Sequence, residues 1–382
     1  MQREGNVTCS SCGQDVPAGR YCVVCGESLA DEVAVRRGYS AAPHQRVWTP
    51  APLSTLFPAL PRTEMRRFHA AALAGTALMV GLACFRLFPL ALVVAAILVP
   101  LLTVMYVYDV DVYEDEPLRL VALTMLWGLL AGVVVTAAAR ALIETGATAL
   151  VERDVGTTLL RGVAVPLVGL GAVMLGPLLL LRYPRFNDVL DGVTFGVAAA
   201  VSFAGASLLV ESSDFFATGL RPYGSVPTWI VRVLELGLGV PLLAGAVVGG
   251  ACASLWLRYR APVRDRAALG PLGSPVVGIA LAGVTLVAAA LAQATLSDRL
   301  ALVVVVLLDG AALVWLRRTI HLGLLQEAAE HPIGPPVTCP NCGHDTPHHT
   351  FCIECGVSFQ ALPKGRPSAN EPLPEAPGGA PA

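Results

Sequence analysis

Eight of the ten cysteines fall into Cys-x-x-Cys pairs, two pairs near each end of the 382-residue chain. The first segment, CSSCGQDVPAGRYCVVCG, covers residues 9–26, and the second, CPNCGHDTPHHTFCIECG, covers residues 339–356. Two residues between cysteines allow both thiolates of one tight turn to face one ion, and the glycine after each turn lets the backbone fold back toward the sulfurs. Each segment therefore predicts a closed four-thiolate metal site with no vacant position for water or substrate.

A structural zinc ion is the expected occupant of each site, and rubredoxin-like iron is the competing metal for four thiolates. A segment of about twenty residues is too small to hold its fold by apolar burial, so metal binding supplies its folding free energy. The predicted ligands of the two zinc ions are Cys9, Cys12, Cys22 and Cys25 in one site and Cys339, Cys342, Cys352 and Cys355 in the other.

The two segments align without a gap and form an internal repeat. Shared positions beyond the cysteines are Gly13 and Gly343, Asp15 and Asp345, Pro17 and Pro347, Tyr21 and Phe351, and Gly26 and Gly356. The second copy also contains His344, His348 and His349, whose counterparts in the first copy are Gln14, Ala18 and Gly19. The shared ligand set is therefore cysteine alone, and we expect the three histidines on the surface.

The chain between the repeats is strongly apolar. Charged residues make up 14% of the sequence and the mean hydropathy is +0.65, against roughly 25% charged residues in an average soluble protein. Eight apolar segments approach the ~20 residues that a helix needs to cross ~30 Å of hydrocarbon. They cover about residues 68–85, 88–108, 118–139, 162–181, 189–210, 229–257, 276–296 and 300–316. The sequence thus predicts an all-α multi-pass transmembrane bundle of about eight helices, with a small zinc ribbon at each end.

The predicted domain order follows from these composition shifts. It comprises an N-terminal zinc ribbon (1–29), an extended Pro-rich linker (30–62), a polytopic membrane domain (63–320), a C-terminal zinc ribbon (335–360) and a disordered Pro/Ala tail (361–382).

Orientation and compartment can be predicted from parity and from redox chemistry. An even number of crossings places both ribbons on one side, and metal-binding thiolates require a reducing compartment. The predicted inner loops also carry more arginines than the outer loops. The first 60 residues are polar and resemble no secretory signal peptide. Arginine is used almost to the exclusion of lysine, as in GC-rich bacterial genomes. We therefore expect a bacterial plasma membrane protein with both termini in the cytoplasm.

The charge of the ribbons argues against a nucleic-acid partner. The whole chain has a net charge of -2, and residues 335–360 contain no lysine or arginine. Phosphate binding requires clustered positive charge. Besides the lipid bilayer, the expected partners are cytosolic or membrane proteins.

Part of the membrane domain resembles a known family. The stretch YEDEPLRLVALTMLWG (113–128) is similar to the entry segment of the PrsW-type intramembrane metalloproteases, and residues 163–211 follow that family's pattern of a proline-started helix, a short basic loop and an Asp-Gly helix start. The likeness covers about residues 68–257. It implies regulated cleavage of membrane-anchored proteins such as anti-sigma factors.

The catalytic motifs of that family are missing from this sequence. Its Glu-Glu-x-x-Lys motif, the glutamate of its Phe-x-x-x-Glu motif and its later histidine correspond here to Gly169, Leu170 and Val173, to Ser207 and to Gly237. No histidine occurs between His69 and His321, so both an intramembrane metal site and a histidine-assisted serine protease lack their usual groups. The surviving acids fall mostly at helix ends or in loops.

Asp309 is the exception, since it lies in the middle of a predicted helix. A charge there costs at least ~2.5 kcal/mol and marks a functional residue, unless an arginine or a backbone group pairs with it. An aspartyl protease would combine Asp309 with Asp109, but no Gly-x-Gly-Asp motif accompanies Asp309.

These observations favour a non-enzymatic pseudoprotease, a scaffold or sensor that presents two cytosolic zinc ribbons to protein partners. The alternative is a divergent intramembrane metalloprotease with unrecognised ligands. A small-molecule transporter is disfavoured by the scarcity of polar residues within the helices.

The topology can be tested by thiol labelling. A membrane-impermeant maleimide added to intact cells should leave the eight ribbon cysteines unmodified until the membrane is permeabilised, because both ribbons are expected in the cytoplasm. Labelling of either ribbon from outside would overturn the even number of crossings.

Overall fold

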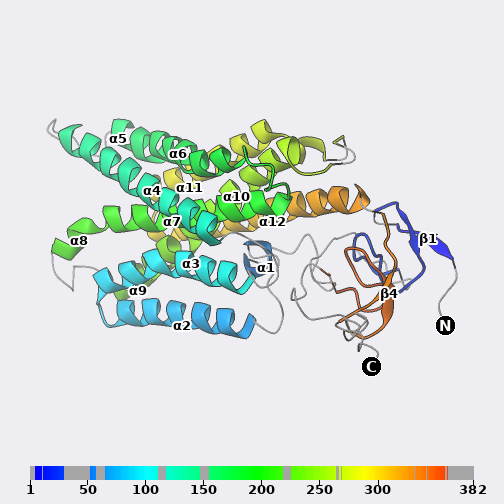
Figure 1. Ribbon diagram of the computed structural model, residues 1–382. Helices are drawn as coiled ribbons and strands as arrows, with labels where there is room; N and C mark the ends of the chain where they lie inside the picture. The colour runs from blue at the N-terminus through cyan, green and yellow to red at the C-terminus, as the bar shows by residue number, and fades with distance from the viewer. Residues whose placement is uncertain are drawn as a thin grey trace, which may run out of the picture.

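The computed structural model describes two small β-hairpin modules and a helical bundle (Figure 1). The described residues are 5–10, 12–29, 52–56, 65–110, 118–146, 155–217, 225–263, 266–267, 269–330, 332–340, 342–357 and 359. Residues 113–117 of the stretch that resembles the PrsW-type entry segment and the predicted tail at 361–382 lie outside these ranges.

Eight helices or helix combinations are long and apolar enough to cross a membrane, which confirms the predicted number of apolar segments within the described residues. They are α2 (Met65–Cys84), α3 (Phe88–Val110), α4 (Leu118–Gly146), the continuous α5, η1 and α6 (Val155–Leu159, Leu160–Ala164 and Val165–Leu180), α7 (Val189–Glu211), the continuous α9, η2 and α10 (Val226–Leu234, Glu235–Gly239 and Val240–Tyr259), α11 (Pro275–Thr295) and α12 (Asp298–Glu330). Short elements complete the bundle: α1 (Pro52–Leu56), α8 (Ser213–Ala217) and η3 (Gly270–Gly273).

Helices α7 and α10 form the centre of the bundle. The spans containing them are 72% buried, whereas that of α2 is only 17% buried and lies at the periphery. Their sequences are rich in glycine, alanine and valine, and such small residues allow helix backbones to approach closely. A Cβ atom added to Gly128 of α4 would lie 2.1 Å from the carbonyl oxygen of Ala199 in α7, and one added to Gly205 of α7 would lie 2.2 Å from that of Ala96 in α3. Packing in the bundle therefore depends on the absence of side chains at these positions.

Two membrane-length helices contain a π-helical turn, and a proline explains each one. The turns η1 and η2 are followed directly by Val165-Pro166 and Val240-Pro241. Because proline has no N–H and its ring clashes with the carbonyl four residues earlier, the regular helical bond is lost there. The preceding valine bonds five residues back instead, from Val165 to the Leu160 carbonyl and from Val240 to the Glu235 carbonyl. Both turns thus widen the helix just before a proline.

Helix α12 is longer than the predicted segment at 300–316. Its 33 residues span about 50 Å, so it extends beyond the ~30 Å of a bilayer core toward the C-terminal hairpin. Near this end, Asp188 caps α7 by accepting a hydrogen bond from the Leu190 N–H at 3.1 Å, and it also bonds the Glu327 side chain of α12. Burial raises the pKa of Asp188 to about 6. The carboxyl pair joins the projecting part of α12 to the start of the central helix.

The described part of the segment predicted as an extended linker is a docked helix. Helix α1 packs on α12, α10 and α7, with Leu56 only 2% exposed. Arg317 of α12, itself buried, donates to Thr55 Oγ1 at 3.4 Å. Burial of this apolar turn holds residues 52–56 as a helix against the bundle.

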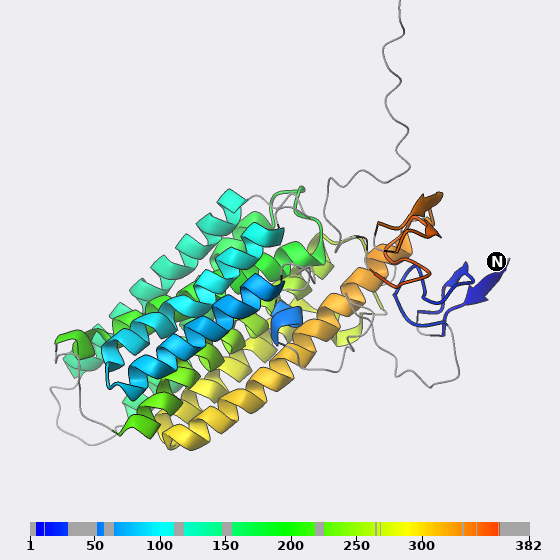
Figure 2. The same ribbon diagram turned by 90° about the horizontal axis from the view of Figure 1, so that it is seen from below.

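Both hairpin modules lie at the same end of the bundle (Figures 1 and 2), as an even number of crossings requires. The first contains β1 (Asn6–Thr8) and β2 (Asp15–Pro17), and the second contains β3 (Pro336–Thr338) and β4 (Asp345–Pro347). We call residues 5–29 the N-terminal ribbon and residues 332–359 the C-terminal ribbon. The end of α12 points at the second of them.

The dependence on close packing can be tested with two glycines. Gly128→Ala should lower stability by roughly 1–3 kcal/mol, because the new methyl group would collide with the α7 backbone. Gly171→Ala in α6 is the matched control, since a Cβ there meets no atom within 4 Å, and it should leave stability unchanged or raise it by up to about 1 kcal/mol. Thermal unfolding in detergent measures both, and equal melting temperatures would contradict the packing argument.

Candidate metal centres

Each ribbon is built from the same hairpin followed by the same pair of turns. The registers coincide, with Asn6 opposite Pro17 in one and Pro336 opposite Pro347 in the other. In both hairpins a threonine hydroxyl donates to the aspartate across the strands, Thr8 to Asp15 at 2.6 Å and Thr338 to Asp345 at 2.8 Å. The internal repeat in sequence is therefore a repeat in structure.

Glycines close the cysteine turns in the left-handed backbone region. Gly13, Gly26, Gly343 and Gly356 have φ values of 71°, 70°, 74° and 65°, a conformation that residues with a Cβ rarely adopt. Each glycine N–H donates back to the carbonyl of the first cysteine of its pair, as Gly13 does to Cys9 at 2.8 Å and Gly343 to Cys339 at 2.7 Å. Both sulfurs of a Cys-x-x-Cys pair thus face the same point.

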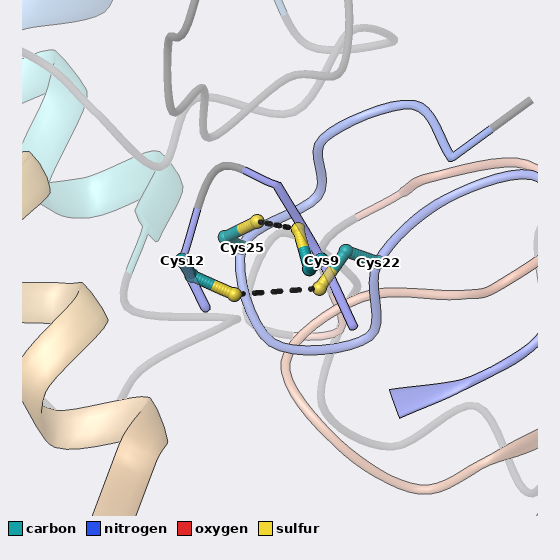
Figure 3. Close-up of side chains that lie close together, drawn as sticks. All are labelled: Cys9, Cys12, Cys22 and Cys25. Atoms are coloured by element: carbon teal, nitrogen blue, oxygen red, sulfur yellow. Dashed lines mark hydrogen bonds between the residues drawn. The ribbon is translucent and has the colours of Figure 1, made fainter. Parts of the chain in front are cut away.

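The eight predicted ligands converge as two quartets, and each quartet could hold a metal ion. Within each quartet all sulfur atoms lie within 4.8 Å of one another. The Sγ atoms of Cys9 and Cys25 are 3.6 Å apart and those of Cys12 and Cys22 are 3.8 Å apart (Figure 3). In the C-terminal ribbon, Cys339 to Cys355 and Cys342 to Cys352 both measure 3.8 Å. Four sulfurs at ~2.3 Å from a tetrahedral centre are separated by about 3.8 Å, so the spacing fits a tetrahedral metal thiolate.

These distances exclude disulfide bonds, which require sulfur atoms about 2.05 Å apart. All eight cysteines are free thiols, and five of them are buried: Cys9, Cys22, Cys25, Cys339 and Cys352. Neighbouring sulfurs, Cys12 first, lower the pKa of Cys9 and raise that of Cys25, while burial raises the pKa of Cys342. Four thiolates cannot share so small a space without a cation, and a divalent metal would favour the deprotonated form of all four.

The expectation for the histidines is correct for two and wrong for one. His344 and His348 are exposed, but His349 is only 9% exposed. Its Nδ1 atom lies 3.1 Å from the carbonyl oxygen of Val23 in the other ribbon. His349 thus belongs to an interface between the ribbons and is not part of a cysteine quartet.

The ribbons pair with each other through reciprocal backbone hydrogen bonds. The Tyr21 N–H donates to the Ile353 carbonyl at 2.9 Å, and the Phe351 N–H donates to the Val23 carbonyl at 2.9 Å. Tyr21 corresponds to Phe351 in the repeat, and Val23 corresponds to Ile353. Each ribbon therefore offers the same two positions to the other, which is the arrangement of a twofold homodimer realised within one chain.

Side chains also contribute to this pairing, and they differ between the two ribbons. Phe351 is fully buried, and its ring lies 2.9 Å from where a Cβ on Gly26 would stand. Gly19 lies directly against the Ile353 side chain, and its counterpart His349 contacts Val23. Sequence reasoning missed the interface because alignment of the repeats shows likeness, whereas the contact depends on where the two chain ends meet.

The positions that the predicted resemblance would align with protease residues pack against neighbouring helices. Gly169 of α6 lies against the ring of Phe203 in α7, where a Cβ would come within 2.9 Å. Ser207 of α7 accepts a hydrogen bond from Thr136 of α4 at 2.9 Å, and Gly237 packs against Ala95 and Met79. Among the described residues, the two cysteine quartets are the clusters suited to a metal ion.

Asp309 lies half-buried in α12, and its Oδ1 atom is buried without a hydrogen-bond partner in the described part of the chain. Its Oδ2 atom is 3.7 Å from the Cβ position of Gly239, which closes η2. The side chain of Asp109 is outside the description, so a pair of membrane aspartates stays a prediction.

Comparisons with known proteins give no relative for this chain. No family model, curated protein or solved structure matches it. The resemblance to PrsW-type proteases therefore stays a prediction.

Metal content tests the two centres directly. The purified chain should contain two metal ions, and changing Cys9 and Cys12 to Ser should leave one, because removal of two ligands opens one closed shell. Changing Cys339 and Cys342 as well should remove both. Elemental analysis of detergent-purified protein supplies the counts, and Cys84→Ser on exposed α2 is the control that should keep both ions.

Proposed function

We propose that this protein is a non-enzymatic membrane scaffold or sensor, which presents its two ribbons to protein partners as one paired unit. The observation that carries the proposal is the reciprocal pairing of Tyr21 with Ile353 and of Phe351 with Val23. Two independent ribbons would be tethered loosely to the two ends of the chain. The paired ribbons instead form one rigid surface beside the projecting end of α12.

In this proposal each quartet binds zinc as a structural ion. Four thiolates at tetrahedral spacing leave no coordination position for substrate. The metal ion therefore stabilises the fold of the ribbon and takes no part in catalysis. The eight long apolar helices fit a multi-pass membrane protein. We place it in a bacterial plasma membrane with the ribbons in the reducing cytoplasm.

Charge favours a protein partner over a nucleic acid. The described residues of both ribbons include one basic side chain, Arg20, against the acids Asp15, Glu27, Asp345 and Glu354. A phosphate backbone would be repelled by this balance. Exposed Asp15 and Asp345 and half-buried Glu354 suit a protein partner with a basic docking segment.

The second candidate function is a divergent intramembrane metalloprotease. It rests on the sequence resemblance and on Asp309, the half-buried acid of α12 whose Oδ1 atom is buried without a hydrogen-bond partner among the described residues. This function requires a third metal ion, bound inside the bundle, that survives the loss of all eight ribbon cysteines. Detection of such an ion would reject the scaffold proposal in favour of the protease.

The paired unit can be tested by separating the ribbons without unfolding them. Ile353→Asp places a charge in the interface and should split the pair, while both metal ions are retained because no ligand changes. A photo-crosslinking amino acid at exposed Ser10 should capture a protein partner in the parent chain and lose it in the variant. Ile333→Asp, at an exposed position before β3, is the matched control and should retain the crosslink. Unchanged crosslinking in Ile353→Asp would contradict the proposal.

A further inference from the structure

A cavity of about 460 Å³ opens at the end of the bundle remote from the ribbons. It lies where α8 and α9 are seen in Figure 1, opposite the hairpins. Residues from α3, α4, α6, α7, α9, α11 and α12 line it, so seven of the eight membrane-length spans contribute. A cavity of this size falls in the range that binds small molecules.

The two π turns each direct a charged side chain into this cavity. Arg161 belongs to η1 and Glu235 belongs to η2. The local sequences LRGVAVP (160–166) and ELGLGVP (235–241) share a glycine four residues before the proline, where the ring would otherwise crowd the backbone. π turns inside helices occur frequently at functional sites. Here both π turns contribute a charged side chain to the same cavity.

Two of the three arginines in the cavity have acidic partners. Arg140 binds both carboxylate oxygens of Asp214, at 2.8 and 2.9 Å, and also donates to the Val210 carbonyl at the end of α7. Arg232 stands 3.7 Å from Asp298 and lies over the ring of Trp229. These contacts fasten α8, α9 and the start of α12 around the cavity.

The formal charges of the side chains that line the cavity do not cancel. The described lining of the cavity contains three arginines (Arg140, Arg161 and Arg232) and four acids (Glu211, Asp214, Glu235 and Asp298), a formal net charge of −1. Arg161 and, more weakly, Arg140 act electrostatically on Glu211. Arg232 acts electrostatically on Glu235 but also faces Asp298, so among the described residues Glu235 shares its one arginine neighbour with a second acid.

Glu235 is also the most enclosed of these groups. It is only 4% exposed, and its Oε1 atom accepts one hydrogen bond, from Gln293 Nε2 at 3.0 Å. A carboxylate can accept about four hydrogen bonds, so the bond from Gln293 leaves capacity for a donor of a ligand. An ionisable group inside a membrane bundle marks a substrate or ion site by default.

We infer that this cavity binds a small organic amine with a single positive charge, whose ammonium group is held by Glu235. The ligand supplies the one positive charge that the cavity lacks. A bare monovalent ion is a poorer fit, because the volume is many times the ~30 Å³ share of one water molecule. The lining also includes the apolar side chains Leu92, Leu208, Leu236 and Ala290, which suit the hydrocarbon part of an amine. The inference is independent of the function proposed for the ribbons.

Ligand-dependent thermal stability of the full-length protein in detergent tests this inference. The probes are butylamine, hexylamine and phenethylamine, each compared with the alcohol of the same skeleton. At least one amine should stabilise the protein saturably at concentrations up to about 1 mM, and the matching alcohol should not. Glu235→Gln should weaken binding of that amine about tenfold or more, because a charge-assisted hydrogen bond becomes a neutral one.

Two further variants keep the test decisive. Ala294→Trp, at an exposed position of the cavity rim, should block the amine without changing any charge. Glu354→Gln in the C-terminal ribbon is the control for loss of an acid elsewhere and should bind the amine normally. A melting temperature of each ligand-free variant close to that of the parent protein shows that its bundle is folded. Equal stabilisation by amine and alcohol, undiminished binding to Glu235→Gln, or no response to any amine would each overturn the inference.

Discussion

Convergence of four sulfur atoms on one point is the constraint on which each ribbon depends. A hairpin of three-residue strands has almost no apolar core, so the geometry of its turns must be fixed by the thiolates and by what they bind. The left-handed glycines make that convergence possible by turning the backbone toward the sulfurs. Once the turns are fixed, the backbone at Tyr21 and Val23 is presented in one defined orientation.

The pairing of the ribbons follows from this rigidity. Reciprocal hydrogen bonds form only between ordered backbone groups, as in the bonds from Tyr21 to Ile353 and from Phe351 to Val23. The chain between them supplies a high effective concentration, because both termini emerge at the same end of the bundle. The bundle therefore favours pairing of the two ribbons, although these lie far apart in the sequence. The two ribbons differ at some corresponding positions, such as Gly19 and His349. Their pairing is therefore only approximately symmetric.

Within the bundle, small residues and prolines have opposite effects. Glycines such as Gly128 and Gly205 let α3, α4 and α7 meet at backbone distance. Prolines at 166 and 241 interrupt the regular helix, and the resulting π turns place Arg161 and Glu235 at the end remote from the ribbons. The charged cavity and the ribbon pair thus occupy opposite ends of one tightly packed body. The long helix α12 runs from Asp298 at the cavity to the start of the C-terminal ribbon.

The sequence by itself determined the cysteine ligand sets and the number of apolar spans. Both are local patterns, since a Cys-x-x-Cys-Gly turn and a run of ~20 apolar residues need no information from elsewhere in the chain. Tertiary structure decided the rest. The burial of His349, the docking of α1 at Leu56 and the pairing of Val23 with Phe351 each join segments far apart in sequence. The cavity around Glu235 likewise assembles from seven spans, and charge balance among distant side chains becomes visible only when the helices are packed together.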